Sequence, residues 1–202
     1  MVLAGVIISA SLLIVATTLY PGGSNSDKNS VGFNWTKNFF SNLFQEKAIN
    51  GADNPARIWA DLGMIILSIS FAIFFIHSSK KINQKGAAAV IKYGGIASMV
   101  ATFLIVTRLH DLMVSIASTL FLISLFYITV FILKSRLTLL KIICIVYLLF
   151  FYYLLYLYGF GHWDPLAIVQ KIHFFSTIIL VLLIEYFTEK EDFEHIVSRK
   201  RK

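Results

Sequence analysis

The sequence predicts an all-α fold, an integral membrane bundle of six transmembrane helices with a short interfacial helix in its first outer loop. The 202 residues are 57% hydrophobic and only 14% charged. Soluble domains are about 25% charged, so this chain has too little polar surface to coat a soluble globule. Six apolar runs follow one another, each about as long as a helix that crosses a hydrocarbon core.

Breakers and helix-capping residues mark where these runs begin and end. Tyr20-Pro21-Gly22 ends the first run, and no basic residue precedes that run, so we expect a retained helix rather than a signal peptide. Asn54-Pro55 and Asp164-Pro165 read as the starts of the second and sixth helices. Gly94-Gly95 is typical of close helix packing in a membrane. We therefore expect a single membrane domain over 1–202, with spans at 2–20, 56–77, 87–107, 112–133, 142–158 and 166–187.

A long polar loop, 21–55, separates the first two spans. Within it, residues 34–46 carry Trp35, Phe39, Phe40, Leu43 and Phe44 at helical spacing, with polar residues between them. Thirteen residues are too few to span a bilayer. The pattern predicts an amphipathic helix that lies in the interface or over the mouth of the bundle.

The basic residues predict the orientation of the chain. Segments on one side hold twelve Lys and Arg and those on the other hold six: Lys80, Lys81, Lys85, Lys92, Lys134, Arg136, Lys141, Lys190, Arg199, Lys200, Arg201 and Lys202, against Lys28, Lys37, Lys47, Arg57, Arg108 and Lys171. Because basic residues concentrate in cytoplasmic segments, both termini are predicted to be cytoplasmic, in the plasma (inner) membrane. The segment 188–202 is then a cytoplasmic basic tail, in contact with anionic lipid rather than nucleic acid.

This orientation gathers ionisable side chains on the outer half. Asp61 lies six residues past Pro55, ~9 Å down its helix, and His173 lies eight past Pro165, ~12 Å down. Ionisable groups at such depths usually face the bundle interior or water. The predicted polar pocket, with the first loop as its cover, comprises Asn34, Ser41, Asn42, Arg57, Asp61, Arg108, His110, Asp111, His162, Asp164 and His173.

Four of these residues have side chains that suit a divalent metal such as zinc: His110, Asp111, His162 and His173. A metal held there could activate water for hydrolysis of a membrane-borne substrate. Residues of the predicted pocket also have structural interpretations. Arg57 and Asp61 can form an ion pair within one helix, Asp111 and Asp164 can cap helices, and His173 can bond a neighbouring helix.

The layout resembles a family of bacterial six-helix membrane proteins of unknown function that is distantly similar to the DRAM/Sfk-type membrane proteins. The resemblance is carried by Tyr20-Pro21-Gly22 at the end of the first helix, by the segment 38–43 (NFFSNL) and by the Asn-rich turn 50–54. It covers most of the chain in layout and implies a topology. It implies no reaction.

Three functions are compatible with these patterns. The first is a multi-pass membrane protein whose extracytoplasmic polar pocket binds a lipid or small ligand, with membrane lipids as its partners. The second is a metal-dependent membrane hydrolase that uses the outer His/Asp cluster. The third is a small transporter, since three helices on each side of the fourth helix start permit an inverted repeat.

Overall fold

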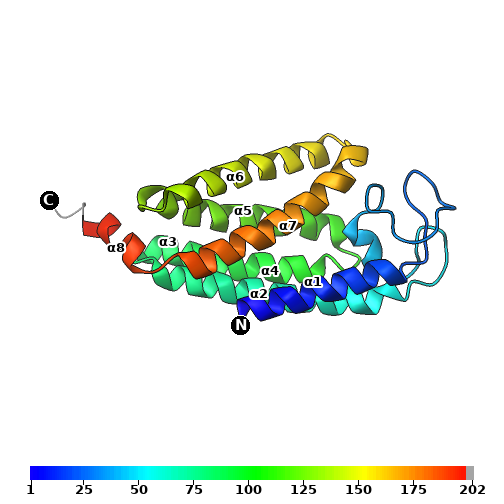
Figure 1. Cartoon of the computed structure of the whole chain (residues 1–202), viewed down its shortest axis with the longest axis horizontal. Coiled ribbons are helices and arrows are strands. Elements are labelled where there is room, and N and C mark those ends of the chain that lie inside the picture. The colour runs from blue at the N-terminus through cyan, green and yellow to red at the C-terminus, as the bar shows by residue number, and fades with distance from the viewer. Residues whose placement is uncertain (199–202) are drawn as a thin grey trace.

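The computed structural model describes residues 1–198 and contains six long, antiparallel helical spans (Figure 1). The spans are α1 (Val2–Leu19), α2 (Ala56–Lys81), the continuous run of α3 (Lys85–Ala89), η2 (Val90–Gly94) and α4 (Gly95–Leu104), then α5 (His110–Lys134), α6 (Thr138–Gly159) and α7 (Trp163–Phe187). Two short helices, η1 (Phe40–Phe44) and α8 (Glu191–Ser198), lie outside the spans. All six spans are long and apolar enough to cross a membrane, which confirms the predicted six-helix fold.

The connections place the ends of successive spans alternately at two ends of the bundle (Figure 1). We call one the loop end, because it carries the long first loop (20–55) and the turns at 105–109 and 160–162. The other is the termini end, which carries the start of α1, the end of α7 and α8. The short turns between the later spans force consecutive helices to pack side by side and antiparallel.

Small residues hold α1 against α2. The Ser9 hydroxyl donates to the Gly63 carbonyl at 2.8 Å, and a Cβ on Gly63 would meet Leu13 at 3.2 Å. Ala56 and Ala60, further toward the loop end of α2, are fully buried. Small side chains let helix backbones approach closely, which is how helices associate where lipid removes the hydrophobic driving force.

The third span contains one turn of π-helix, η2, directly before Gly95. A π turn shifts the face that a helix presents to its neighbours. A Cβ on Gly95 would lie only 2.1 Å from Cγ of Phe75. The predicted close packing at Gly94-Gly95 therefore exists, and Gly95 is where α4 meets α2.

The outer surface of the bundle is apolar. On α6, for example, large side chains are exposed along its length: Ile142, Ile145, Val146, Leu149, Tyr152, Tyr153 and Tyr156. A helix that exposes such a face would aggregate in water and is solvated in lipid. The burial pattern and the lengths of the spans therefore agree on a membrane environment.

The first loop contains less helix than the sequence predicts. The predicted amphipathic helix at 34–46 is replaced by turns followed by the five-residue 3₁₀ helix η1. Two asparagine side chains bind the backbone instead: Asn38 Oδ1 accepts from the Asn34 N–H at 2.9 Å, and Asn42 Oδ1 accepts from the Phe39 N–H at 2.7 Å. Such local bonds compete with helix formation. The stripe is split accordingly, with Phe40, Leu43 and Phe44 buried but Trp35 exposed.

The first part of the predicted tail contains a short helix. Residues 191–198 form α8, and the Phe193 ring is buried against Phe131 of α5, with ring centroids 6.5 Å apart. The basic cluster Arg199–Lys202, which contributes to the predicted orientation, lies outside the described residues. The charged segment is thus attached to the termini end of the bundle by an aromatic contact.

Candidate functional site

A cavity of about 630 Å³ opens at the loop end and extends into the bundle. All six spans and η1 contribute to its walls, most of which are apolar. The polar members of the lining are Ser41, Thr102, His110, Asp111, Ser115, Ser118, Thr119, Gln170, His173 and Thr177. Mostly apolar walls with a few polar groups are typical of small-molecule sites.

The cavity is closed toward the termini end. It runs from His110 to Phe121 along α5, ~16 Å, and from Trp163 to Thr177 along α7, ~21 Å. Beyond that depth the core is filled by side chains with no exposed surface, among them Phe74, Phe75, Leu125 and Ile132. The cavity therefore lies in the loop-end half of the bundle and is roughly half a bilayer in depth.

The first loop forms a roof over the cavity through η1, and α7 holds it there. The Lys171 ammonium donates to the carbonyl oxygens of Asn38 and Ala167 and lies 5.6 Å and 5.7 Å from the ring centroids of Phe33 and Phe40. Gln170 Oε1 accepts from the Phe40 N–H at 3.2 Å. Carbonyl oxygens and aromatic faces together compensate the buried charge, so this lysine attaches the roof to the bundle.

Two buried asparagines fix the roof internally. Asn54 Nδ2 donates to the carbonyls of Leu43 at 3.1 Å and Gln45 at 2.8 Å, and its Oδ1 accepts from the Ala56 N–H at 3.2 Å. Asn38, with no exposed surface, donates to the Gly23 carbonyl at 2.7 Å. The start of α2 and the end of η1 are thus joined through one side chain.

The floor of the cavity holds a polar triad of His173, Tyr147 and Thr177. The Tyr147 hydroxyl lies 3.0 Å from His173 Nε2 and 2.6 Å from Thr177 Oγ1, and Thr177 Oγ1 donates to the His173 carbonyl at 2.7 Å. The imidazole also contacts the ring of Phe151, with centroids 4.6 Å apart. These contacts hold the imidazole in one orientation, deep in the bundle.

The predicted pocket residues separate into three groups. Ser41, His110, Asp111 and His173 line the cavity. His162 and Asp164 line a separate surface hollow next to Asn25 and Ser26. Asn34, Asn42, Arg57, Asp61 and Arg108 line neither space.

The residues in the last group mostly have structural contacts. Arg57 bridges Glu46 at 3.2 Å and Asp61 at 3.6 Å, so it ties the first loop to α2. Asn34 accepts the Thr36 N–H and hydroxyl within an exposed turn. Arg108 is exposed, and no ion pair joins it to another described residue.

The predicted zinc ligands are not brought together. Among residues 1–198, no three His, Cys, Asp or Glu side chains lie close enough to hold a metal ion. His162 precedes α7 and His173 lies eleven residues further on, which separates them by ~16 Å along the helix axis. His110 bonds its neighbour Asp111 at 2.8 Å instead. His173 therefore lies deeper in the bundle than His110, Asp111 and His162, and the four predicted metal ligands do not form one cluster in the described structure.

Charged pairs outside the spans are exposed. Lys47 and Asp53 form an ion pair in the first loop, and Lys37 lies 3.7 Å from Asp164. The hydrogen bond and charge of Lys47 hold the pKa of Asp53 below its usual value. Exposed ion pairs of this kind add little stability, so the fold of the first loop depends on them only weakly.

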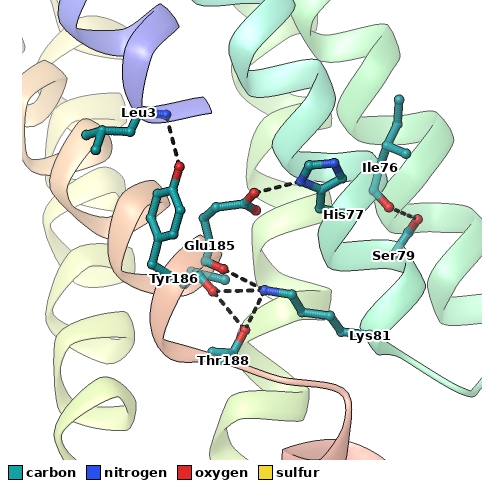
Figure 2. A network of polar contacts seen from close by, with 9 residues as sticks. Leu3, Ile76, His77, Ser79, Lys81, Glu185, Tyr186 and Thr188 are labelled. Carbon is teal, nitrogen blue, oxygen red and sulfur yellow. Dashed lines mark hydrogen bonds and ion pairs between the residues drawn. The ribbon is translucent and has the colours of Figure 1, made fainter. Parts of the chain in front are cut away.

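A second polar network lies at the termini end and joins α1, α2 and α7 (Figure 2). His77 Nδ1 lies 2.6 Å from Glu185 Oε1, and the Leu3 N–H donates to the Tyr186 hydroxyl at 3.2 Å. Figure 2 shows Lys81 donating to the Glu185 carbonyl at 2.8 Å and to Thr188 Oγ1 at 3.2 Å. A lysine at the last carbonyls of a helix satisfies orphan acceptors and the helix dipole. This network fastens helix ends and borders no described cavity.

Sequence reasoning missed Lys171, Gln170, Tyr147 and Thr177 as contributors to the site. Lys171 had a usable signal, since a lysine eight residues inside a span is costly unless it has buried partners. Tyr147 had none, because its contact with His173 depends on how α6 rotates against α7, whereas Thr177 bonds His173 within α7, four residues along the same helix. Comparisons with protein-family models, with curated proteins and with solved structures find no match for this chain.

Proposed function

We propose that this chain is a multi-pass protein of the plasma (inner) membrane that binds a lipid or similar amphiphile in the cavity. The observation that carries the proposal is a cavity of about 630 Å³ that has mostly apolar walls and lies in the loop-end half of the bundle. Its depth of ~16 to ~21 Å matches one leaflet of a bilayer, whose full hydrocarbon core is ~30 Å. An acyl or isoprenoid chain fits such walls, whereas an ion would leave its hydration unreplaced.

The proposal includes an orientation, with the loop end extracytoplasmic and both termini cytoplasmic. It is supported by the predominance of Lys and Arg in segments at the termini end. In this orientation the ligand comes from the outer leaflet or the outer face. Ser41, His110 and Asp111 then lie at the mouth, where the cavity meets water.

The alternatives have less support. The hydrolase hypothesis needs metal ligands or another nucleophile-activating group, and no three of the predicted ligands lie close enough together in the described structure to hold a metal ion. A transporter needs access from both sides, and fully buried side chains such as Phe74, Phe75 and Leu125 fill the core between the cavity and the termini end. Binding requires only the cavity as it stands.

A cavity-filling substitution tests the proposal. Ser118 lines the cavity, so Ser118→Phe is expected to place a ring inside it and obstruct it, while Ser11→Phe on the exposed face of α1 adds the same ring outside it. Trp163 also lines the cavity and serves as the reporter after Trp35→Phe and Trp59→Phe. We expect a monoglyceride with a dibrominated acyl chain to quench Trp163 saturably, at one ligand per protein.

The control variants decide what the quenching means. Ser11→Phe should quench as the parent protein does, and Ser118→Phe should lose the saturable component. Quenching that rises linearly with the bulk lipid fraction and is equal in both variants would contradict binding in the cavity. It would leave only the ordinary contact of an interfacial tryptophan with lipid.

A further inference from the structure

His173 is the deepest imidazole in the cavity, and its hydrogen-bonding capacity is only half used. One ring nitrogen, Nε2, contacts the Tyr147 hydroxyl at 3.0 Å. The other, Nδ1, has no hydrogen-bond partner among the described residues. In the described chain, Nδ1 is also not one of the fully enclosed side-chain atoms that lack a hydrogen-bond partner. It therefore retains some accessible surface. Because His173 lines the cavity, we assign that open surface to the cavity.

Proton counting assigns the state of that nitrogen. Thr177 has one hydroxyl proton, and the bond from Thr177 Oγ1 to the His173 carbonyl at 2.7 Å uses it. Thr177 Oγ1 must then accept the Tyr147 proton across 2.6 Å. The Tyr147 oxygen in turn accepts from His173, so Nε2 carries the proton and Nδ1 is left as an acceptor.

The surroundings favour a neutral imidazole and a neutral ligand. No ion pair involves His173 in the described part of the chain, and its ring lies against those of Tyr147, Phe150 and Phe151. A charged headgroup at this depth would lose its hydration without gaining a counter-charge. A carboxylate would in addition place an acceptor against an acceptor.

We propose that the cavity selects a neutral lipid alcohol, whose hydroxyl donates a hydrogen bond to Nδ1 of His173. This inference rests on the proposed function, because it names the class of amphiphile that the cavity holds. The apolar part of the ligand lies against the side chains that line the cavity above the floor, such as Met64, Leu67 and Phe174. Tyr147 is a positioning residue, since it fixes which nitrogen of His173 can accept.

The test compares two competitors, one with a hydroxyl proton that can be donated and one with a methyl group in its place. Oleyl alcohol and oleyl methyl ether are each titrated against the brominated monoglyceride, with Trp163 quenching as the signal. A donor that satisfies a buried acceptor favours the alcohol by about 10-fold over the ether. We define the alcohol preference as the apparent affinity for the alcohol divided by that for the ether. Comparing this ratio between the parent protein and each variant cancels the difference in how the two ligands partition into detergent.

Two variants remove the preference in different ways. In His173→Gln the amide nitrogen can still donate to the Tyr147 hydroxyl, but no acceptor remains at the Nδ1 position. We expect the alcohol preference to fall about 10-fold while the monoglyceride still quenches saturably. In Tyr147→Phe the imidazole is free to carry its proton on either nitrogen, so the preference is expected to fall as well. Thermal midpoints of both variants report whether they fold, and Tyr147→Phe carries the test if His173→Gln does not.

The outcomes separate this inference from the proposed function. If the monoglyceride quenches saturably but alcohol and ether compete equally in the parent protein, the alcohol inference is overturned and the lipid cavity stands. An alcohol preference that survives both His173→Gln and Tyr147→Phe overturns the role of His173. If no ligand quenches saturably, the cavity itself is not a binding site.

Discussion

Replacement of Gly95 by alanine is expected to destabilise the bundle by about 3 kcal/mol. The new Cβ would lie 2.1 Å from Cγ and 2.5 Å from Cβ of Phe75. Phe75 has no exposed surface and packs against the rings of Phe74 and Phe121, at 5.1 Å and 5.6 Å between centroids. It has no room to move, so α4 must move away from α2. The free energy of unfolding in a denaturing-detergent titration measures the loss.

A second glycine provides the matched control. Gly86 lies in the helical segment α3, and a Cβ there would meet nothing within 4 Å. Gly86→Ala is therefore expected to be neutral or to stabilise by about 0.5 to 1 kcal/mol, through the lower entropy of the unfolded chain. Equal effects of the two substitutions would show that α4 does not approach α2 at Gly95 as described.

The second large effect is expected at Asn54, the link between the roof and α2. Asn54→Ala removes the donor to the carbonyls of Leu43 and Gln45 and the acceptor for the Ala56 N–H. Unpaired buried carbonyls cost about 1 to 3 kcal/mol, and loss of a cap costs about 1 kcal/mol. We expect a loss of about 3 kcal/mol in the free energy of unfolding, together with faster proteolysis of the loop 20–55.

Asn50 is the control for this experiment, because it lies in the same loop and is exposed. Its side chain accepts a single bond, from the Ala52 N–H at 3.1 Å. Asn50→Ala is expected to change stability by less than about 0.5 kcal/mol. If Asn54→Ala were as mild as Asn50→Ala, the buried network would not be what holds the roof in place.

The spans are the part of this fold that can be read from sequence, since hydropathy and length alone determine them. Gly94-Gly95 was also readable, because a glycine pair inside an apolar run has few other uses. The first loop was not. A stripe at helical spacing predicted a helix over 34–46, but the competing bonds of Asn38 and Asn42 to the backbone limit the helix to Phe40–Phe44.

Four of the eleven predicted pocket residues, Ser41, His110, Asp111 and His173, are among those that line the cavity. Their chemistry depends on depth along each helix and on rotation between helices. His162 and His173 are kept apart by the rise of α7, while Tyr147 reaches His173 only because α6 turns that face inward. The first fact follows from the spacing of the two histidines along one helix, but the rotation of α6 has no signature in composition or spacing.

Thiol labelling tests most directly the central claim, a cavity that is reached from an extracytoplasmic loop end. In a Cys144→Ala background, Ser115→Cys places a thiol on the cavity wall, Ser26→Cys one in the first loop and Asn83→Cys one in the α2–α3 turn. A membrane-impermeant reagent added to intact cells should label Ser26→Cys and Ser115→Cys but not Asn83→Cys. Labelling of Asn83→Cys alone, with Ser115→Cys reached only after the cells are opened, would contradict the account.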